Sequence, residues 1–189
     1  MALPNNAHQF SHRNRRWAGP LLAVALFFFT GASSAHAQTE DGVKAAFVYN
    51  FAKFTNWPTN AFASSSAPVL VGFVGADALA DTFETIVAGK NVNGHAFSIR
   101  RYPAGADVHN CHILFIGDPG QATAVLNAVQ GKPILTIGDS DVFASSGGMV
   151  KLFRVGSRIR FDLDFEATQA ARLKLDARVC QLAENLRGK

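Results

Sequence analysis

The chain is 189 residues long, carries 18 Lys and Arg against 14 Asp and Glu, and contains two cysteines. Three of the basic residues and none of the acidic ones lie in the first 37 residues, which leaves 15 basic against 14 acidic side chains. That balance excludes the basic surface that nucleic-acid-binding proteins need. The 152 residues after position 37 suffice for one domain with its own core and exclude a multidomain protein.

The N-terminal segment has the three parts of a secretory signal peptide. Three arginines lie within residues 13–16, an uninterrupted apolar run spans 21–29, and residues 35–37 form an A-x-A cleavage motif. The apolar run is too short for a transmembrane helix, which needs about 20 residues. We therefore predict that residues 1–37 are a signal peptide cleaved after Ala37, and that residues 38–189 form the exported domain.

The first half of this domain alternates helical and strand-like patterns. The predicted elements are a helix at 41–57, an exposed loop at 60–68, a strand at 69–74, a helix at 79–87 and a strand at 96–102. In the first helix, Val43, Phe47, Phe51 and Phe54 share one face, and Pro58 stops the helix. This face is predicted to pack in the core.

The second half also begins with alternating strand and helix patterns, and a β-hairpin pattern follows them. The predicted elements are a strand at 111–116, a turn at 117–120, a helix at 121–129, a strand at 133–137 and a β-hairpin made of 149–155 and 158–165. A helical region follows from Glu166, and its apolar stripe comprises Leu175, Val179, Leu182, Ala183 and Leu186, with Asp176 as a helix cap. Together the elements predict a single layered α/β domain with a mixed β-sheet flanked by helices, a C-terminal β-hairpin and a closing helix.

Catalytic motifs with specific spacing are missing from the sequence, which predicts a protein that is not an enzyme and needs no metal or cofactor. Cys111 and His112 are neighbours on a predicted strand, so their side chains should point to opposite faces. A metal site at His109, Cys111 and His112 lacks a fourth ligand at standard spacing. One hypothesis to be kept is a hydrolase or metal enzyme that uses Cys111 and His112. Cys111 and Cys180 either form a disulfide or are two buried thiols.

Five residues are candidates for contact with a protein partner. Tyr49 and Trp57 lie off the apolar stripe of the first helix, and Trp57 is either a core residue or an interface anchor. Arg158, Arg160 and Asp162 share the polar face of the second hairpin strand. That face is either an ordinary solvated surface or a recognition surface.

Five segments resemble the YfiR family of small periplasmic proteins. They are VKAAFVYNFAKFTNWP (Val43 to Pro58), CHILFIG (Cys111 to Gly117), PILTIGD (Pro133 to Asp139), GGMVKLFRVGSRIRFDLDFEAT (Gly147 to Thr168) and LKLDARVCQLA (Leu173 to Ala183). The first segment and the Gly-Gly-Met segment are the specific ones. The resemblance implies a YfiR-like periplasmic domain over residues 38–189.

The resemblance also implies a function. YfiR-like proteins are homodimeric periplasmic repressors that hold an inner-membrane diguanylate cyclase inactive through its periplasmic sensor domain, which lowers cyclic di-GMP and biofilm formation. The family's redox control depends on cysteines that this chain lacks, since its first strand, VLVGFVG, has no thiol. The family's usual Asn is Asp164 here, and a usual Ser near the last helix is Asp176.

A rival hypothesis is a periplasmic sensor of a small ligand. In open α/β sheets, ligands bind at the carboxyl ends of the strands. That rule places the ligand near Gly75, Gly117 and Asp139.

Overall fold

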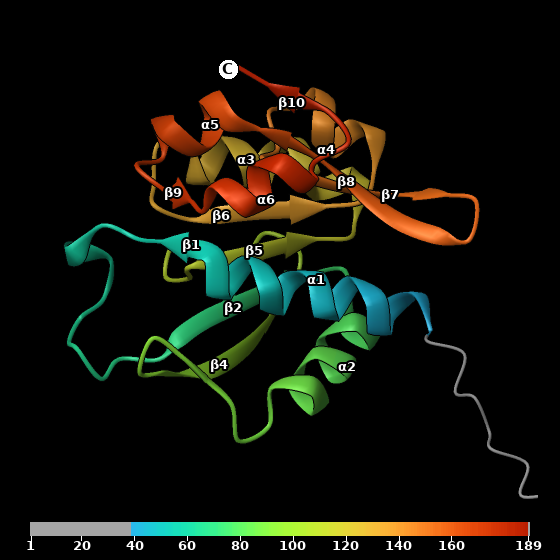
Figure 1. Cartoon of the computed structure of the whole chain (residues 1–189). Coiled ribbons are helices and arrows are strands. Elements are labelled where there is room, and N and C mark those ends of the chain that lie inside the picture. Colours follow the sequence, from blue (N-terminus) through green and yellow to red (C-terminus); the bar gives the residue numbers. More distant parts are fainter. Residues whose placement is uncertain (1–38, 189) are drawn as a thin grey trace, which may run out of the picture. The chain divides into compact units, whose positions relative to one another are not determined.

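A computed structural model of the chain describes residues 39–188 (Figure 1), and the predicted signal peptide lies outside these residues. The helices are α1 (Glu40–Phe54), α2 (Asp77–Val87), α3 (Pro119–Val129), α4 (Asp141–Ser145), α5 (Phe165–Ala170) and α6 (Ala177–Leu182), with a 3-10 turn at Thr59–Ala61. The strands are β1 (Thr55–Asn56), β2 (Val69–Val74), β3 (Asn91–Val92), β4 (His95–Tyr102), β5 (Ile113–Ile116), β6 (Leu135–Gly138), β7 (Val150–Val155), β8 (Arg158–Asp164), β9 (Lys174–Leu175) and β10 (Leu186–Arg187).

The main sheet is mixed and has the strand order β10-β8-β7-β6-β5-β2-β4-β3. Its centre, from β4 to β7, is parallel, because each of these strands except β5 is reached through a helix. The chain places β4 on one side of β2 and β5 on the other, so the topological switch point lies between β2 and β5. β8 pairs antiparallel with β7, as the predicted hairpin requires.

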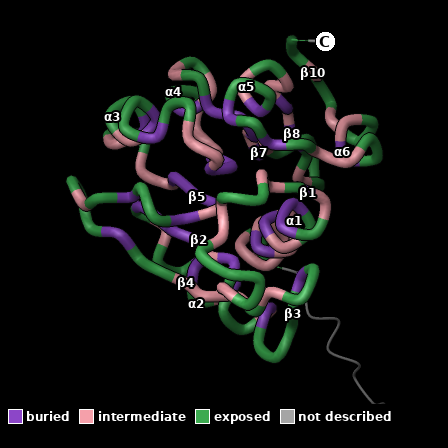
Figure 2. The backbone as a smooth tube through the Cα atoms, turned by 90° about the vertical axis from the view of Figure 1, so that its left-hand side faces the viewer, coloured by how far each residue is buried: buried purple, intermediate pink, exposed green. Residues whose placement is uncertain are grey.

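Helices cover both faces of this sheet. One core contains the α1, α2 and α6 residues that pack on Val71, Phe73, Ile113 and Phe115. The other contains the α3 and α4 residues that pack on Leu114 and Ile116. Alternate residues of the same strands therefore enter different cores, and the buried strands lie between the two helical layers (Figure 2). The layered α/β architecture with a mixed sheet is confirmed.

The first helix ends earlier than the sequence predicted. It was expected to reach Trp57 but stops at Phe54, because Thr55 and Asn56 pair antiparallel with β9. The buried face also differs from the predicted stripe. Ala45, Val48, Phe51 and Ala52 are buried, whereas Val43, Phe47 and Phe54 are only half-buried. Small residues let α1 lie close to α2 and the sheet, a feature that a search for large apolar residues misses.

The predicted C-terminal helical region is confirmed only in part, because α5 (Phe165–Ala170) begins at the expected place but two short strands replace other parts of the region. Leu175 lies in β9, Leu186 lies in β10, and α6 between them has only six residues. Val179 is buried as predicted, but Leu182 is 70% exposed. The helix does not continue to Leu186, because β10 is extended and pairs in parallel with β8 at the edge of the sheet. Asp176 is confirmed as a cap, since its carboxylate accepts a hydrogen bond from the backbone N–H of Arg178 at 2.9 Å.

Within residues 39–188, no helix combines the length and the apolar character that a membrane crossing requires.

Candidate interaction sites

The five predicted contact residues do not form one surface. Tyr49 and Trp57 belong to the C-terminal half of α1 and the segment after it, while Arg158 and Arg160 lie on the hairpin beside its N-terminal end. Asp162 lies further along β8, where its carboxylate accepts a hydrogen bond from the Asn185 amide at 2.7 Å. The structure therefore presents two candidate surfaces instead of one.

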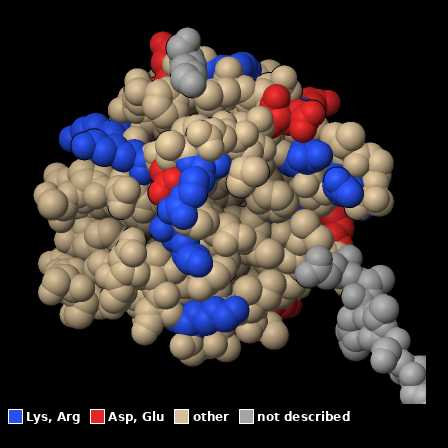
Figure 3. All heavy atoms as spheres, viewed as in Figure 1, with Lys and Arg blue, Asp and Glu red and all other residues tan. Residues whose placement is uncertain are grey.

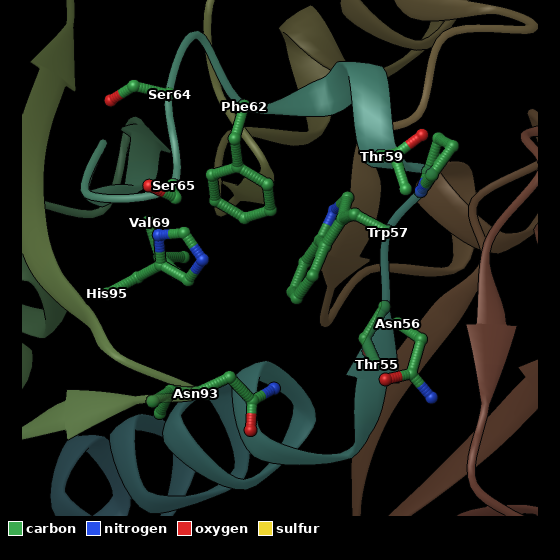
Figure 4. A pocket seen from close by; sticks show the side chains of 12 residues that line it. Thr55, Asn56, Trp57, Thr59, Phe62, Ser64, Ser65, Val69, Asn93 and His95 are labelled. Atoms are coloured by element: carbon green, nitrogen blue, oxygen red, sulfur yellow. The ribbon is translucent and has the colours of Figure 1, made fainter.

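The first surface is the Trp57 cavity, a cavity of about 420 Å³ lined by Trp57, Phe62, His95, Asn93, Val69 and neighbouring residues. Figure 4 shows the Trp57, Phe62 and His95 rings around this space. Val69 and His95 begin β2 and β4, so the cavity lies at the amino ends of these strands. Trp57 is half-buried, and its indole N–H donates to the carbonyl of His112 at 3.2 Å. It thus combines the core and surface roles that the sequence left open.

An aromatic stack forms one wall of the cavity. The Phe62 ring lies between the His95 and His112 rings, with 4.2 Å between centroids on either side and nearly parallel planes. His112 accepts a hydrogen bond from the Leu70 N–H at Nδ1 and bonds the Ala61 carbonyl through Nε2. Burial lowers the pKa of His112, so the neutral imidazole is favoured. These contacts fix the predicted exposed loop to the strands.

Tyr49 packs on the sheet and is not a free anchor. Its ring lies 5.8 Å from that of Phe97, and the ammonium groups of Lys53 and Lys90 lie 5.7 and 5.1 Å from its centroid. The Tyr49 ring is therefore half-buried and contacts other groups of the domain.

The second surface is the hairpin groove, which lies between the start of α1 and the β7–β8 hairpin and has a volume of about 450 Å³. Val43, Phe47, Ile159 and Leu182 supply its apolar lining, and Arg154, Arg158, Arg160 and Glu40 supply its charges. The predicted alternation of β8 is confirmed, because Phe161 and Leu163 are buried whereas Arg158 and Arg160 are exposed.

Ion pairs fix α1 against both the hairpin and the end of β6. Glu40 pairs with Arg154 of β7 and, at 2.8 Å, with Lys44, which in turn contacts Asp139 at 2.6 Å. Hydrogen bonds from Lys44 and Arg154 lower the pKa of Glu40 to about 2. Burial opposes the charge on Lys44, but its hydrogen bonds to Asp139 and Glu40 prevail and raise its pKa. This network keeps the groove's α1 wall in place.

The turns at Gly75 and Gly117, two of the positions named in the rival hypothesis, leave little space between them for a ligand. A Cβ on Gly117 would lie 2.8 Å from the Gly75 carbonyl oxygen, and one on Gly75 would lie 2.5 Å from the Asp118 Cβ. The Asp139 carboxylate accepts a hydrogen bond from the Lys44 ammonium group. The turns at the switch point therefore pack against each other, and the Trp57 cavity lies at the opposite ends of the strands.

The two cysteines belong to different cores. Cys111 is buried in the core under α3, and burial raises its pKa to about 12. Cys180 packs against the core on the α1 side, so the sheet separates the two thiols. The buried Cys111 thiol, with its raised pKa, is a poor nucleophile. Among residues 39–188, no group of three or more His, Cys, Asp or Glu side chains is arranged to hold a metal ion.

Sequence reasoning missed three residues of these surfaces. Phe62 lay in a stretch predicted as an exposed loop, His95 was given no role, and Leu182 was assigned to the apolar stripe of a helix. A single large aromatic in an Ala- and Ser-rich loop is a signal that could have identified Phe62. No local signal could have identified Leu182, because its exposure depends on where α6 ends.

The fold and the two surfaces define a class of protein, namely a small α/β domain whose exposed features suit binding. The YfiR/HmsC-like family model matches residues 41–184, which is nearly the whole described domain. The chain belongs to the YfiR/HmsC-like family. Members of this family are periplasmic regulators rather than enzymes, and they act with a diguanylate cyclase. A search of curated proteins returned no match.

Proposed function

We propose that this protein is a periplasmic repressor that contacts the periplasmic sensor domain of an inner-membrane diguanylate cyclase and lowers cyclic di-GMP output. The family match over residues 41–184 is the observation that carries this proposal. Repression requires only that the protein bind the inactive state of the cyclase more tightly than the active state. A binding surface suffices for this task, and the homodimer is part of the proposal.

Gene deletion tests the proposal. Loss of the gene should raise cellular cyclic di-GMP and surface attachment, and a plasmid copy should restore both. The same deletion in a strain that also lacks the partner cyclase should have no effect. An unchanged cyclic di-GMP level in a strain whose cyclases are intact would contradict repression.

The Trp57 cavity favours a second function, a periplasmic sensor of a small ligand. Its volume of about 420 Å³ lies within the range of small-molecule sites, and Trp57, Phe62 and His95 supply aromatic surface beside polar side chains. Thermal unfolding should then show a saturable rise in Tm with one compound from a panel of periplasmic metabolites, and Trp57→Leu should abolish the rise. The Val142→Leu variant, changed on an exposed face of α4, is the control. A panel without any saturable shift would argue against this function.

A further inference from the structure

The hairpin groove combines an open apolar lining with a cationic rim. Leu182 is 70% exposed at its wall, an unusual position for a leucine that ends a helix. Val43, Phe47 and Ile159 are half-buried in the same groove. Figure 1 shows the β7–β8 hairpin extending beyond α1 and α6.

The charges of the rim are incompletely neutralised. Arg154 is paired with Glu40, and the closest approach of Arg160 to Glu184 is 3.8 Å. Among the ion pairs of residues 39–188, none includes Arg158. Figure 3 shows basic side chains in the region of the hairpin, with acidic ones beside them. The groove therefore attracts an anionic partner.

We propose that the hairpin groove binds an amphipathic, acidic segment of the partner cyclase's periplasmic domain. Apolar side chains on one face of that segment would fill the space between Phe47, Ile159 and Leu182, and its carboxylates would meet Arg158 and Arg160. This is the arrangement in which an amphipathic helix lies in a hydrophobic groove. The inference rests on the proposed function, because it identifies the surface and the chemistry of that partner.

A second copy of the chain fits the groove less well. A two-fold interface brings the same patch of both subunits together. If the two-fold axis passed through the groove, Arg158 and Arg160 of one protomer would lie near those of its partner, and like charges across an interface oppose association. A lipid surface also fits less well, because Val43, Phe47 and Ile159 are half-buried in the recess and Leu182 alone among the groove's apolar residues is exposed.

The test compares two double variants with equal changes in charge. R158E/L182D alters the groove, and R172E/V142D alters an exposed arginine next to β9 and an exposed valine of α4. β9 pairs at the C-terminal end of α1, whereas the groove lies at its N-terminal end. Binding to the full-length cyclase in lipid nanodiscs, and inhibition of its cyclic di-GMP synthesis, are measured for both variants and the unmodified exported protein.

R158E/L182D should raise Kd at least about 10-fold, as expected when an apolar anchor and a charge are lost together. R172E/V142D should stay within about 2-fold of the unmodified protein. Added salt should weaken binding of the unmodified protein more than binding of R158E/L182D. Circular dichroism and thermal unfolding establish that both variants are folded.

Each other outcome overturns the inference in an identifiable way. If the unmodified protein fails to bind or inhibit the cyclase, the proposed function fails and the groove assignment fails with it. If the protein binds and R158E/L182D binds equally well, only the groove assignment fails. Loss of a dimer in sedimentation by R158E/L182D alone would assign the groove to a second copy. Binding of the unmodified protein to empty nanodiscs, lost in R158E/L182D, would assign it to lipid.

Discussion

The His112 imidazole uses both of its nitrogens within the protein. Its Nδ1 accepts from the Leu70 N–H at 3.0 Å, and its Nε2 lies 3.1 Å from the Ala61 carbonyl, to which it donates. Only the neutral ring with its proton on Nε2 satisfies both contacts. A second proton would remove the acceptor for Leu70 and place a charge between buried groups, with His95 on the other side of Phe62.

Stability should therefore depend on pH through His112. Burial holds the folded pKa of His112 below the ordinary value of 6.5, so the unfolded chain takes up this proton more readily than the folded one. The free energy of unfolding should fall as pH drops below about 6.5 and level off below the folded pKa. Urea unfolding at several pH values measures this slope, which His112→Gln should reduce. At neutral pH, His112→Gln should cost about 1 kcal/mol for the disturbed hydrogen bonds.

His109 provides the control for this measurement. It is exposed in the loop before β5, so His109→Gln should leave the free energy of unfolding at neutral pH nearly unchanged. Equal pH slopes in the unmodified protein and His112→Gln would show that other groups cause the dependence.

Helix ends explain two positions, Asp164 and Asp176, at which the resemblance led us to expect other residues. Asp164 caps α5, with its carboxylate 2.9 Å from the Ala167 N–H, and Asp176 caps α6. The expected family residues, Asn and Ser, are also good N-cap residues, because each offers an oxygen to the first free N–H groups. Both departures thus preserve the same local function.

A substitution pair at Asp164 tests this explanation. Asp164→Asn should leave the free energy of unfolding within about 0.5 kcal/mol, whereas Asp164→Ala should lower it by about 1 kcal/mol through loss of the cap. Asp162→Ala serves as the control, because Asp162 is two residues away on the same strand face and caps no helix. Equal losses for the Asn and Ala variants at position 164 would refute the capping role.

Elements with strong local patterns were predictable. The apolar run of β2 and the alternation of β8 depend on neighbouring residues, and both strands were found within a residue of the expected bounds. The residue at which α1 ends depends on pairing with a distant strand, and so does the secondary structure of the last 20 residues. Helical spacing cannot reveal those pairings, which also explains why Leu182 was assigned to the apolar stripe of a helix.

The candidate surfaces were only partly predictable for a related reason. The charges of Arg158 and Arg160 are visible in the strand alternation, but the groove needs Val43 and Phe47, which are more than 110 residues away in sequence. The Trp57 cavity likewise needs the meeting of Phe62 and His95. Chemistry-bearing residues could be identified individually, whereas the spaces between them are products of the tertiary fold.

At the scale of the whole molecule, α1 connects the two candidate surfaces. The Trp57 cavity lies beyond its C-terminal end, the hairpin groove lies at its N-terminal end, and ion pairs through Glu40 and Lys44 attach it to β6 and β7. A shift of α1 would therefore change both surfaces together. Both surfaces therefore depend on an intact start of α1, at the N-terminal end of the exported domain.

The position of signal cleavage is the last prediction, and it concerns that end of the domain. Cleavage after Ala37 would leave Gln38 and Thr39 before α1, and the Thr39 hydroxyl caps the helix by accepting from the Gly42 N–H at 3.1 Å. Intact-mass and N-terminal analysis of the periplasmic protein should give a chain that begins at Gln38. Ala37→Lys should block processing, because the cleavage site needs a small residue there, whereas His36→Lys at the intervening position should be processed. An unprocessed polypeptide in the cytosol would contradict export. A mature chain that begins beyond Thr39 would lack the cap and should lose about 1 kcal/mol of stability.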